Sequence, residues 1–151
     1  MADLSFYMRP IFAALSLLSL GACGADDRRE ERLALAGPNA DLAALMKVAD
    51  PDIGARKFST CAACHHIRPN AADVGGPNLY GVYNKALATN SQRFGYTAPL
   101  RDFGGRWDEA TLDRWISNPK AMIPATSMQY DGMADPLDRA DVIAYIRSRA
   151  N

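Results

Sequence analysis

From Asp50 onward, the apolar positions of the chain follow helical spacing, and strand signals are poor. The run Asp50-Pro51-Asp52 combines an N-cap residue, a proline at the first helical position and an acidic residue in the first turn. A helix is therefore predicted from this point to Cys61, with Ile53 and Phe58 on its inner side.

Two further helices are predicted nearer the C-terminus. One covers 108–117 and is stopped by Asn118-Pro119, and the other begins at Asp135-Pro136 with the same capping chemistry. Their apolar faces comprise Thr111, Leu112, Trp115 and Ile116 in the first helix, and Val142, Ile143, Tyr145 and Ile146 in the second.

A long stretch between these helices, 67–107, is rich in Gly, Pro and Asn. An irregular loop of this length is uncommon inside a compact domain. It becomes reasonable if the loop wraps something other than protein. The pattern thus indicates a large apolar cofactor that substitutes for part of the core.

The N-terminus has the pattern of an export signal. Residues 11–20 form a short apolar run, too short for a spanning helix of about 20 residues but typical of a signal-peptide core. The signal is better formed if translation starts at Met8 rather than Met1. The run ends in Leu20-Gly21-Ala22-Cys23, which resembles a bacterial lipobox, so residues 1–22 are predicted to be removed and Cys23 to be lipidated. A plain secretory signal is the alternative.

Residues 23–50 are interpreted as a tether. The mixed charges of 26–32 are typical of a solvated segment. Leu42, Leu45, Met46 and Ala49 have helical spacing, which predicts one short helix in the tether.

Composition and charge limit the function classes. The chain has 151 residues, 48% of them hydrophobic, and 17 basic residues balance 17 acidic ones. One globular domain is expected, over 51–151, and nothing indicates a nucleic-acid partner. The zero net charge conceals a division, because residues 1–50 carry −2 and residues 51–151 carry +2.

The strongest chemical signal is Cys61-Ala62-Ala63-Cys64-His65, the C-x-x-C-H signature of covalent haem attachment. On a helical turn, Cys61, Cys64 and His65 can all face one flat group. The two thiols then form thioethers and His65 becomes the proximal iron ligand, while His66 is expected to face solvent.

Other chemistries also use C-x-x-C. A redox motif prefers a βαβ setting, a zinc site needs a second ligand pair, and an exported protein can form a Cys61–Cys64 disulfide. The export signal favours haem, because this attachment takes place outside the cytoplasm. A distal ligand could come from Met122, Met128 or Met133, and spacing alone does not choose among them.

Several short motifs in order resemble those of class I c-type cytochromes, over about residues 51–150. After the haem motif come Gly76-Pro77-Asn78-Leu79-Tyr80-Gly81, Tyr96-Thr97, Trp107, Asn118-Pro119-Lys120, Ile123-Pro124-Ala125-Thr126-Ser127-Met128 and Asp141-Val142-Ile143-Ala144-Tyr145. The resemblance implies an all-α cytochrome c fold, in which helices and long loops surround one covalent haem c.

The resemblance also implies roles for individual residues. Met128 is the distal iron ligand, and the Pro77 carbonyl accepts the Nδ1–H of His65. The donors around the haem propionates are Tyr96, Thr97, Trp107 and Thr126. The helix at 53–58 is expected to cross the C-terminal helix near Val142 and Tyr145.

Three positions depart from the mitochondrial pattern. Lys85 replaces an arginine near a propionate, Leu100 replaces a buried asparagine, and Trp115 replaces a tyrosine beside the methionine sulfur. The last two changes remove polar groups from the methionine side of the haem. Because such groups tune haem potential, the potential cannot be carried over from the family.

With both axial positions occupied, the resemblance implies a one-electron carrier and not an enzyme. A haem enzyme or gas sensor would need an open sixth position, and a non-haem lipoprotein would use C-x-x-C structurally. The expected partners are a redox protein that donates the electron and another that accepts it. The protein is expected to be a monomer on the periplasmic side of a bacterial membrane, to which the lipid anchor attaches it.

Overall fold

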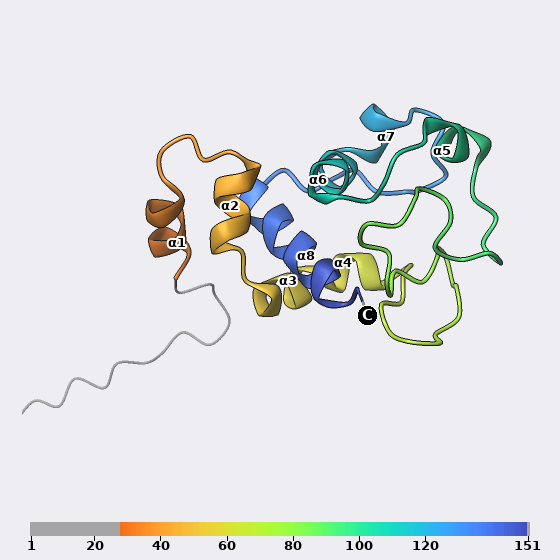
Figure 1. The fold of residues 1–151 in the computed structure, drawn as a ribbon, viewed down its shortest axis with the longest axis horizontal. Coiled ribbons are helices and arrows are strands. Elements are labelled where there is room, and N and C mark those ends of the chain that lie inside the picture. Colours follow the sequence, from red (N-terminus) through yellow and green to blue (C-terminus); the bar gives the residue numbers. More distant parts are fainter. Residues whose placement is uncertain (1–27, 151) are drawn as a thin grey trace, which may run out of the picture.

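The computed structural model of the protein describes residues 28–150. This range is helical, and its β pairing is limited to one isolated antiparallel bridge between Ala86 and Arg106. The predicted signal peptide and Cys23 lie outside the described residues. The helices, drawn in Figure 1, are α1 (Arg29–Ala36), α2 (Leu42–Val48), α3 (Pro51–Lys57), α4 (Ser59–Ala62), α5 (Ala98–Phe103), α6 (Glu109–Ser117), α7 (Pro119–Met122) and α8 (Pro136–Ser148).

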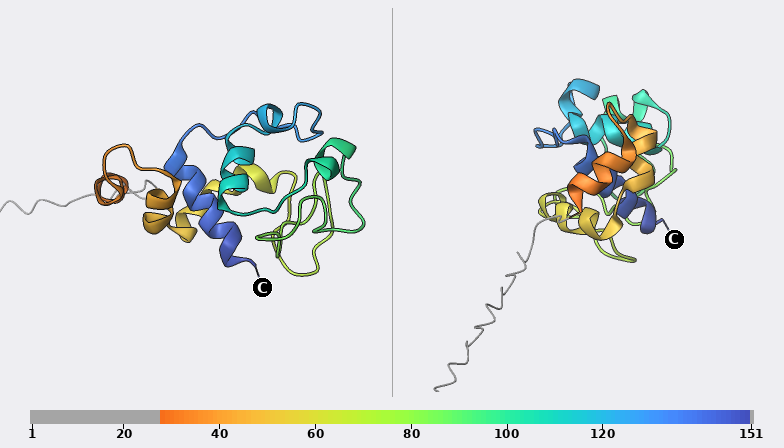
Figure 2. Two further views of the ribbon diagram at one scale, coloured as in Figure 1. Left: turned by 45° about the horizontal axis from the view of Figure 1, so that its top comes forward. Right: turned by 90° about the vertical axis from the view of Figure 1, so that its left-hand side faces the viewer.

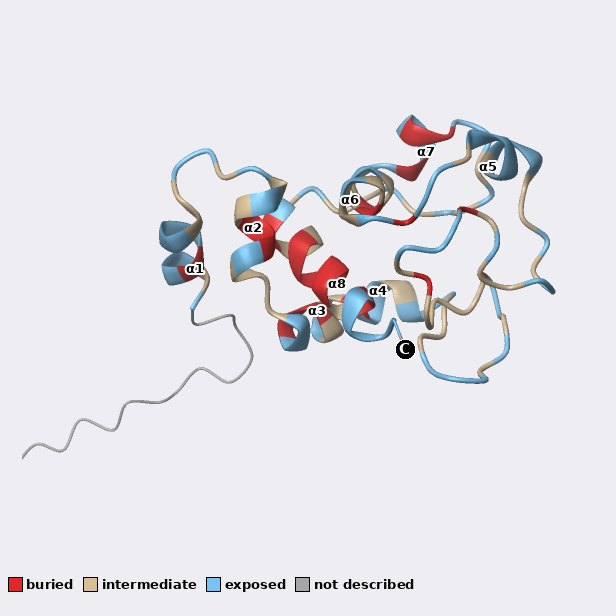
Figure 3. Ribbon diagram, in the orientation of Figure 1, coloured by how far each residue is buried: buried red, intermediate tan, exposed pale blue. Residues whose placement is uncertain are grey.

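The crossing of α3 and α8 is the centre of the fold. The Asp50 side chain accepts hydrogen bonds from the backbone of Asp52 and Ile53, so the predicted cap starts α3. Gly54 brings the two backbones together, and the rings of Phe58 and Tyr145 meet edge to face with centroids 5.3 Å apart. The predicted crossing is confirmed, and Figure 3 shows the buried residues concentrated on α8 and its neighbours.

The helix predicted over 108–117 is present as α6, which packs on α8. Asp108 caps it by accepting from the backbone N–H of Thr111 at 2.8 Å. Asn118-Pro119 ends α6 as expected, and it also starts the short helix α7, because the Asn118 side chain accepts from Ala121 N at 2.9 Å.

The long loop of 67–107 contains α5 and is otherwise irregular. It has scattered backbone hydrogen bonds, such as that from Leu87 N to the Gly105 carbonyl at 3.1 Å, and side chains supply further ones. The Asn90 amide donates to the carbonyls of Asn78 and Tyr80, and Asp73 accepts from Asn78 N and from Ser91 Oγ. Such bonds hold the loop in one shape around the space that it encloses.

The N-terminal part is more structured than a tether. The short helix expected over 42–49 is present as α2, and a second helix, α1, precedes it. The interpretation of 26–32 as a solvated charged segment is wrong for Arg32, which is only 6% exposed. Burial of Arg32 is possible because Asp141 of α8 neutralises it.

Figures 1 and 2 place α1 and the loop of 67–107 at opposite ends of the long axis. Within residues 28–150, no helix is both long and apolar enough to cross a membrane.

Candidate functional site

The C-x-x-C-H motif forms a tight helical turn at the end of α4. Both Cys64 N and His65 N donate to the carbonyl of Cys61, at 3.0 and 2.9 Å. The thiols of Cys61 and Cys64 are both free, so the structure does not support the alternative of a disulfide between them. Burial raises the pKa of Cys61 to about 11, which keeps its sulfur uncharged.

His65 is held in one orientation by the loop opposite it. Its Nδ1 lies 2.8 Å from the Pro77 carbonyl oxygen. Because a carbonyl can only accept, Nδ1 carries the proton and Nε2 keeps its lone pair for a metal. Burial lowers the pKa of His65, against the opposing effect of the Pro77 hydrogen bond, and so favours the neutral ring that ligation needs.

Gly76 makes this orientation possible. A Cβ built on Gly76 would lie only 2.7 Å from His65 Nδ1 and 2.8 Å from Nε2. The backbone of the loop therefore lies directly against the imidazole ring, at a distance that any larger residue would prevent.

His65 lines two adjoining hollows, whose unfilled space of about 480 and 510 Å³ includes solvent at their open sides. Both hollows are lined by His65, Leu79, Trp115 and Met128. The first is completed by Phe58, Cys61, Val82, Trp107, Leu112, Ile116, Val142 and Ile146, and the second by Gly75, Gly76, Pro77, Phe94, Tyr96, Leu100 and Ser127.

The walls of the two hollows suit a large, flat, apolar group. Hydrocarbon and aromatic side chains predominate, together with one imidazole and the sulfur atoms of Cys61 and Met128. Imidazole nitrogen and methionine sulfur are ligands of haem iron, and a cysteine thiol can add to a haem vinyl group. The residues present therefore fit haem.

The three downstream methionines lie in different places. Met128 lines both hollows, whereas Met122 is buried in the core and Met133 packs against that core. The Met128 N–H donates to Thr126 Oγ1 at 3.2 Å, so Thr126 shapes the turn before Met128.

The residues predicted to surround the haem are only partly brought together. Trp107 lines the first hollow and Tyr96 the second, where the Tyr96 hydroxyl accepts from Ser91 N at 3.1 Å. Burial raises the pKa of Tyr96, which keeps that hydroxyl protonated. Thr97 is the N-cap position of α5, and neither Thr97 nor Thr126 is among the lining residues of the two hollows.

Two of the three departures from the mitochondrial pattern lie in the site. Leu100 lines the second hollow, and Trp115 lines both while meeting Trp107 edge to face at 5.5 Å. Lys85 lines neither hollow and is exposed. His66, expected to face solvent, is half-buried, with Nδ1 2.8 Å from the Ala72 carbonyl.

The sequence prediction did not assign several wall residues to the cofactor site, among them Val82, Phe94, Leu112 and Ile146. Leu112 and Ile146 have the helical spacing of core residues, and a cofactor wall has the same pattern. Phe94 and Val82 come from the irregular loop, where no periodicity exists to signal them.

The remaining motif alternatives lack support among the described residues. In 28–150 there is no group of three or more His, Cys, Asp or Glu side chains that could hold a metal ion, and the strands of a βαβ redox unit are missing. Residues 52–150 match the profile of the family described as Cytochrome c. The chain belongs to the cytochrome c family.

Individual cytochromes show the same relationship. Cytochrome c2 of Rhodomicrobium vannielii is 39% identical over 100 residues, which cover 66% of this chain and 79% of that protein. The "Cytochrome c homolog" of Bradyrhizobium diazoefficiens is 38% identical over 104 residues, or 69% of this chain, but the match spans only 56% of that relative's own length. The solved structure of cytochrome cH from Methylobacterium extorquens has a TM-score of 0.61 and 32% identity, and covers 66% of this chain and 99% of that one.

Family membership confirms the predicted all-α cytochrome c fold. It also confirms the predicted cofactor, since cytochrome c proteins bind one covalently attached haem c. The homologues are electron carriers and not enzymes, in agreement with the expectation from the sequence.

Proposed function

We propose that this cytochrome is a single-haem electron carrier in which Cys61 and Cys64 hold haem c through thioethers, and His65 and Met128 are the axial iron ligands. The observation that carries the proposal is the convergence of Cys61, His65 and Met128 on the same hollow. His65 follows α4 and Met128 comes from the loop after α7, so two distant segments supply the two ligands.

Each residue then has a defined task. Pro77 and Gly76 fix the ring of His65, and Thr126 shapes the turn that presents Met128. The bound haem supplies a reversible one-electron couple of its iron. The apolar wall residues exclude water and keep the same environment in both oxidation states, which favours electron transfer without rearrangement.

The propionate carboxylates need donors, because a buried carboxylate without hydrogen bonds is costly. We assign this task to Tyr96, Thr97, Trp107 and Thr126. Tyr96 supports the assignment, because its oxygen accepts from Ser91 N and its own proton remains available to a second acceptor.

Optical spectra of methionine variants test the ligand assignment. In the oxidised protein, Met128→Ala should abolish the weak long-wavelength absorption band that a methionine–iron bond produces. Met122→Ala and Met133→Ala serve as matched controls and should retain this band, since neither side chain lines the hollows. Loss of the band in Met133→Ala alone would show that the assignment is wrong.

We further propose that residues 1–22 are a signal peptide, that residues 23–50 are the tether to the anchor, with helical structure of their own, and that residues 51–151 are the cytochrome c domain. Cys23 then carries lipid, and the protein works on the periplasmic side of a bacterial membrane. The motif Leu20-Gly21-Ala22-Cys23 and the bacterial relatives support this proposal.

Mass spectrometry of the membrane fraction tests the anchor. The expected mature chain begins at Cys23 with acyl chains attached, and it carries haem on Cys61 and Cys64. Cys23→Ser should release the protein from the membrane fraction without loss of haem. A mature chain that begins elsewhere, without acyl mass, would rule out the anchor and leave the electron carrier intact.

The proposed partners are a redox protein that donates the electron and another that accepts it. We propose that the cytochrome is a monomer when it meets each of them. The net charge of +2 over residues 51–151 supports only mild electrostatic steering. The transfer rate to an acidic partner should therefore fall only modestly as ionic strength rises.

A further inference from the structure

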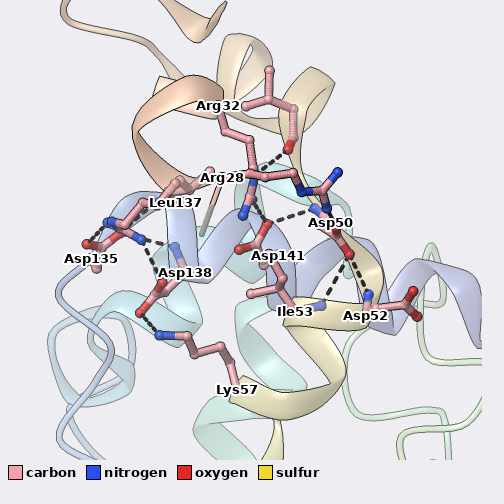
Figure 4. A network of polar contacts seen from close by, with 12 residues as sticks. Arg28, Arg32, Asp50, Asp52, Ile53, Lys57, Asp135, Leu137, Asp138 and Asp141 are labelled. Atoms are coloured by element: carbon pink, nitrogen blue, oxygen red, sulfur yellow. Dashed lines mark hydrogen bonds and ion pairs between the residues drawn. The ribbon is translucent and has the colours of Figure 1, made fainter. Parts of the chain in front are cut away.

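Residues 28–50 lie before the segment that matches the cytochrome c family, yet they are bound to it by buried charges. Arg32 of α1 donates from Nε to the Val48 carbonyl at 2.9 Å, and its guanidinium pairs with Asp141 of α8. Asp141 is fully buried and also accepts from Asp50 N at 2.8 Å. Figure 4 shows this one carboxylate joining α1, the start of α3 and α8.

A second arginine makes an independent contact between α1 and α8. Arg29 pairs with Asp135 and, at 3.0 Å, with Asp138, which lie at the N-terminal end of α8. Arg29 and Arg32 are three positions apart and therefore share one face of α1. Two fixed points on the same face determine the direction of a helix as well as its position.

The helix α2 adds an apolar contact to these ion pairs. Leu45 and Met46 are buried in the same core cluster as Leu137 and Ile143 of α8. The segment is thus built into the core of the haem domain, which a flexible tether would not be.

The place where this segment lies is as specific as its contacts. No residue of α1 or α2 lines either haem hollow. Figures 1 and 2 show α1, where residues 1–27 join the domain, at the end of the molecule remote from the haem-side loop of 67–107.

We propose that residues 28–50 form an orienting clamp. The clamp fixes the point at which residues 1–27 join the domain, at the end of the molecule opposite the haem side, so that a group attached within a few residues of Arg28 lies at that end. If Cys23 is lipidated, as the proposed function has it, the five Cα-to-Cα steps from Cys23 to Arg28 reach at most about 18 Å. A bilayer then lies beside α1, and the haem side faces the redox partners.

Distances between two spin labels test the clamp in the full-length haem protein. The labels are placed at two exposed positions, Leu35 of α1, which is 71% exposed, and Asp102 of α5. They are attached through genetically encoded azido residues, so that the three cysteines do not react. The expected result is a single narrow distance distribution. Arg32→Gln and Arg29→Gln should each broaden it, and should raise deuterium uptake in the peptides of α1 and α2.

Lys120→Gln is the matched control, because it removes an exposed ion pair to Asp131 outside the clamp, and it should change nothing. An unchanged haem spectrum in each arginine variant shows that the haem domain still folds. Arg29 is the more exposed of the two arginines, so Arg29→Gln tests the clamp even if Arg32→Gln prevents folding. A broad distribution in the unmodified protein, or a narrow one in the variant that combines Arg29→Gln with Arg32→Gln, would overturn the clamp. Absence of a haem spectrum in the unmodified protein would count against the proposed function instead.

Discussion

The imidazole of His65 depends on a neighbour that has no side chain. Gly76→Ala would put a methyl carbon 2.7 Å from His65 Nδ1 and push the ring away from the Pro77 carbonyl. We expect a loss of about 1–3 kcal/mol in the free energy of unfolding, as for other overpacked sites. If His65 and Met128 hold the haem iron as proposed, a weaker methionine–iron band should accompany it, because the imidazole would be displaced from the position that Pro77 fixes.

Gly95→Ala is the control for this substitution, since a Cβ at Gly95 would meet nothing within 4 Å. Urea unfolding and the oxidised spectrum of both variants provide the measurements. If both alanines behaved alike, the Gly76 contact would have no part in holding the ligand.

For individual residues, the sequence predicted the chemical role of a side chain better than it predicted whether that side chain is buried. The spacing of Cys61, Cys64 and His65 is a local property of one turn, so it can be interpreted without the fold. The half-burial of His66 depends on the loop that returns to Ala72. The burial of Arg32 depends on an acid 109 positions away, and no local pattern contains that information.

Among the elements, the contact of α3 with α8 sets the geometry of the core, and Gly54 permits it. A Cβ there would lie 2.5 Å from the Asp141 carbonyl carbon and 2.9 Å from Tyr145 Cβ. In an isolated helix, Gly54→Ala would be stabilising by about 0.5–1 kcal/mol. The clash costs about 1–3 kcal/mol, so we expect a net loss of stability.

Urea unfolding distinguishes these two effects by their sign. Gly54→Ala should lower the denaturation midpoint, whereas the same substitution at the open position Gly95 should not. A raised midpoint in Gly54→Ala would mean that the helices separate easily and that the crossing is not tightly fixed.

The ion pair of Arg32 with Asp141 ties α1 to α8, and both side chains are buried. Arg32→Gln leaves the Asp141 carboxylate buried without its partner, so we expect a loss of about 3–5 kcal/mol in the free energy of unfolding. Lys120→Gln, at an exposed pair, should cost less than about 1 kcal/mol. Equal effects in the two variants would show that water reaches Asp141 when α1 leaves.

Helices with caps and a clear apolar face were predictable, and those without them were not. The caps at Asp50, Asp108 and Asp135 mark the starts of α3, α6 and α8. The helix α1 has no side-chain cap at Arg28, and its apolar residues include the exposed Leu33 and Leu35. Its stability comes from packing against α2 and from ion pairs with α8, which sequence periodicity does not reveal.

For the whole molecule, loop-mediated contacts explain why the site was only partly predictable. The two hollows are bounded by α4, α6, α8, the irregular loop of 67–107 and the loop after α7, and only the helical part leaves a periodic pattern in the sequence. The length and composition of the loop predicted a cofactor, but its own hydrogen bonds, such as those of Asn90, decide where each residue lies.

The shifted pKa values of several aspartates determine how the stability of the whole molecule depends on pH. Four aspartates have a pKa below the ordinary value of 3.8: Asp50, Asp73, Asp108 and Asp135. For Asp135 the main cause is the hydrogen bond from Arg29, and for Asp108 it is the backbone N–H of Thr111. Asp141 differs, since burial raises its pKa.

A carboxylate whose pKa is lower in the folded than in the unfolded state stabilises the fold above the unfolded pKa, and this stabilisation is lost as pH falls through the folded pKa. Asp141 has the opposite sign, but it is one group against four. We therefore expect the free energy of unfolding to fall as pH decreases below about 4. Asp108→Asn keeps the helix cap, because asparagine caps as well as aspartate, but it removes one titrating group. Urea unfolding should give this variant similar stability at pH 7 and a shallower loss in acid, and an unchanged slope would show that Asp108 does not contribute to the acid sensitivity.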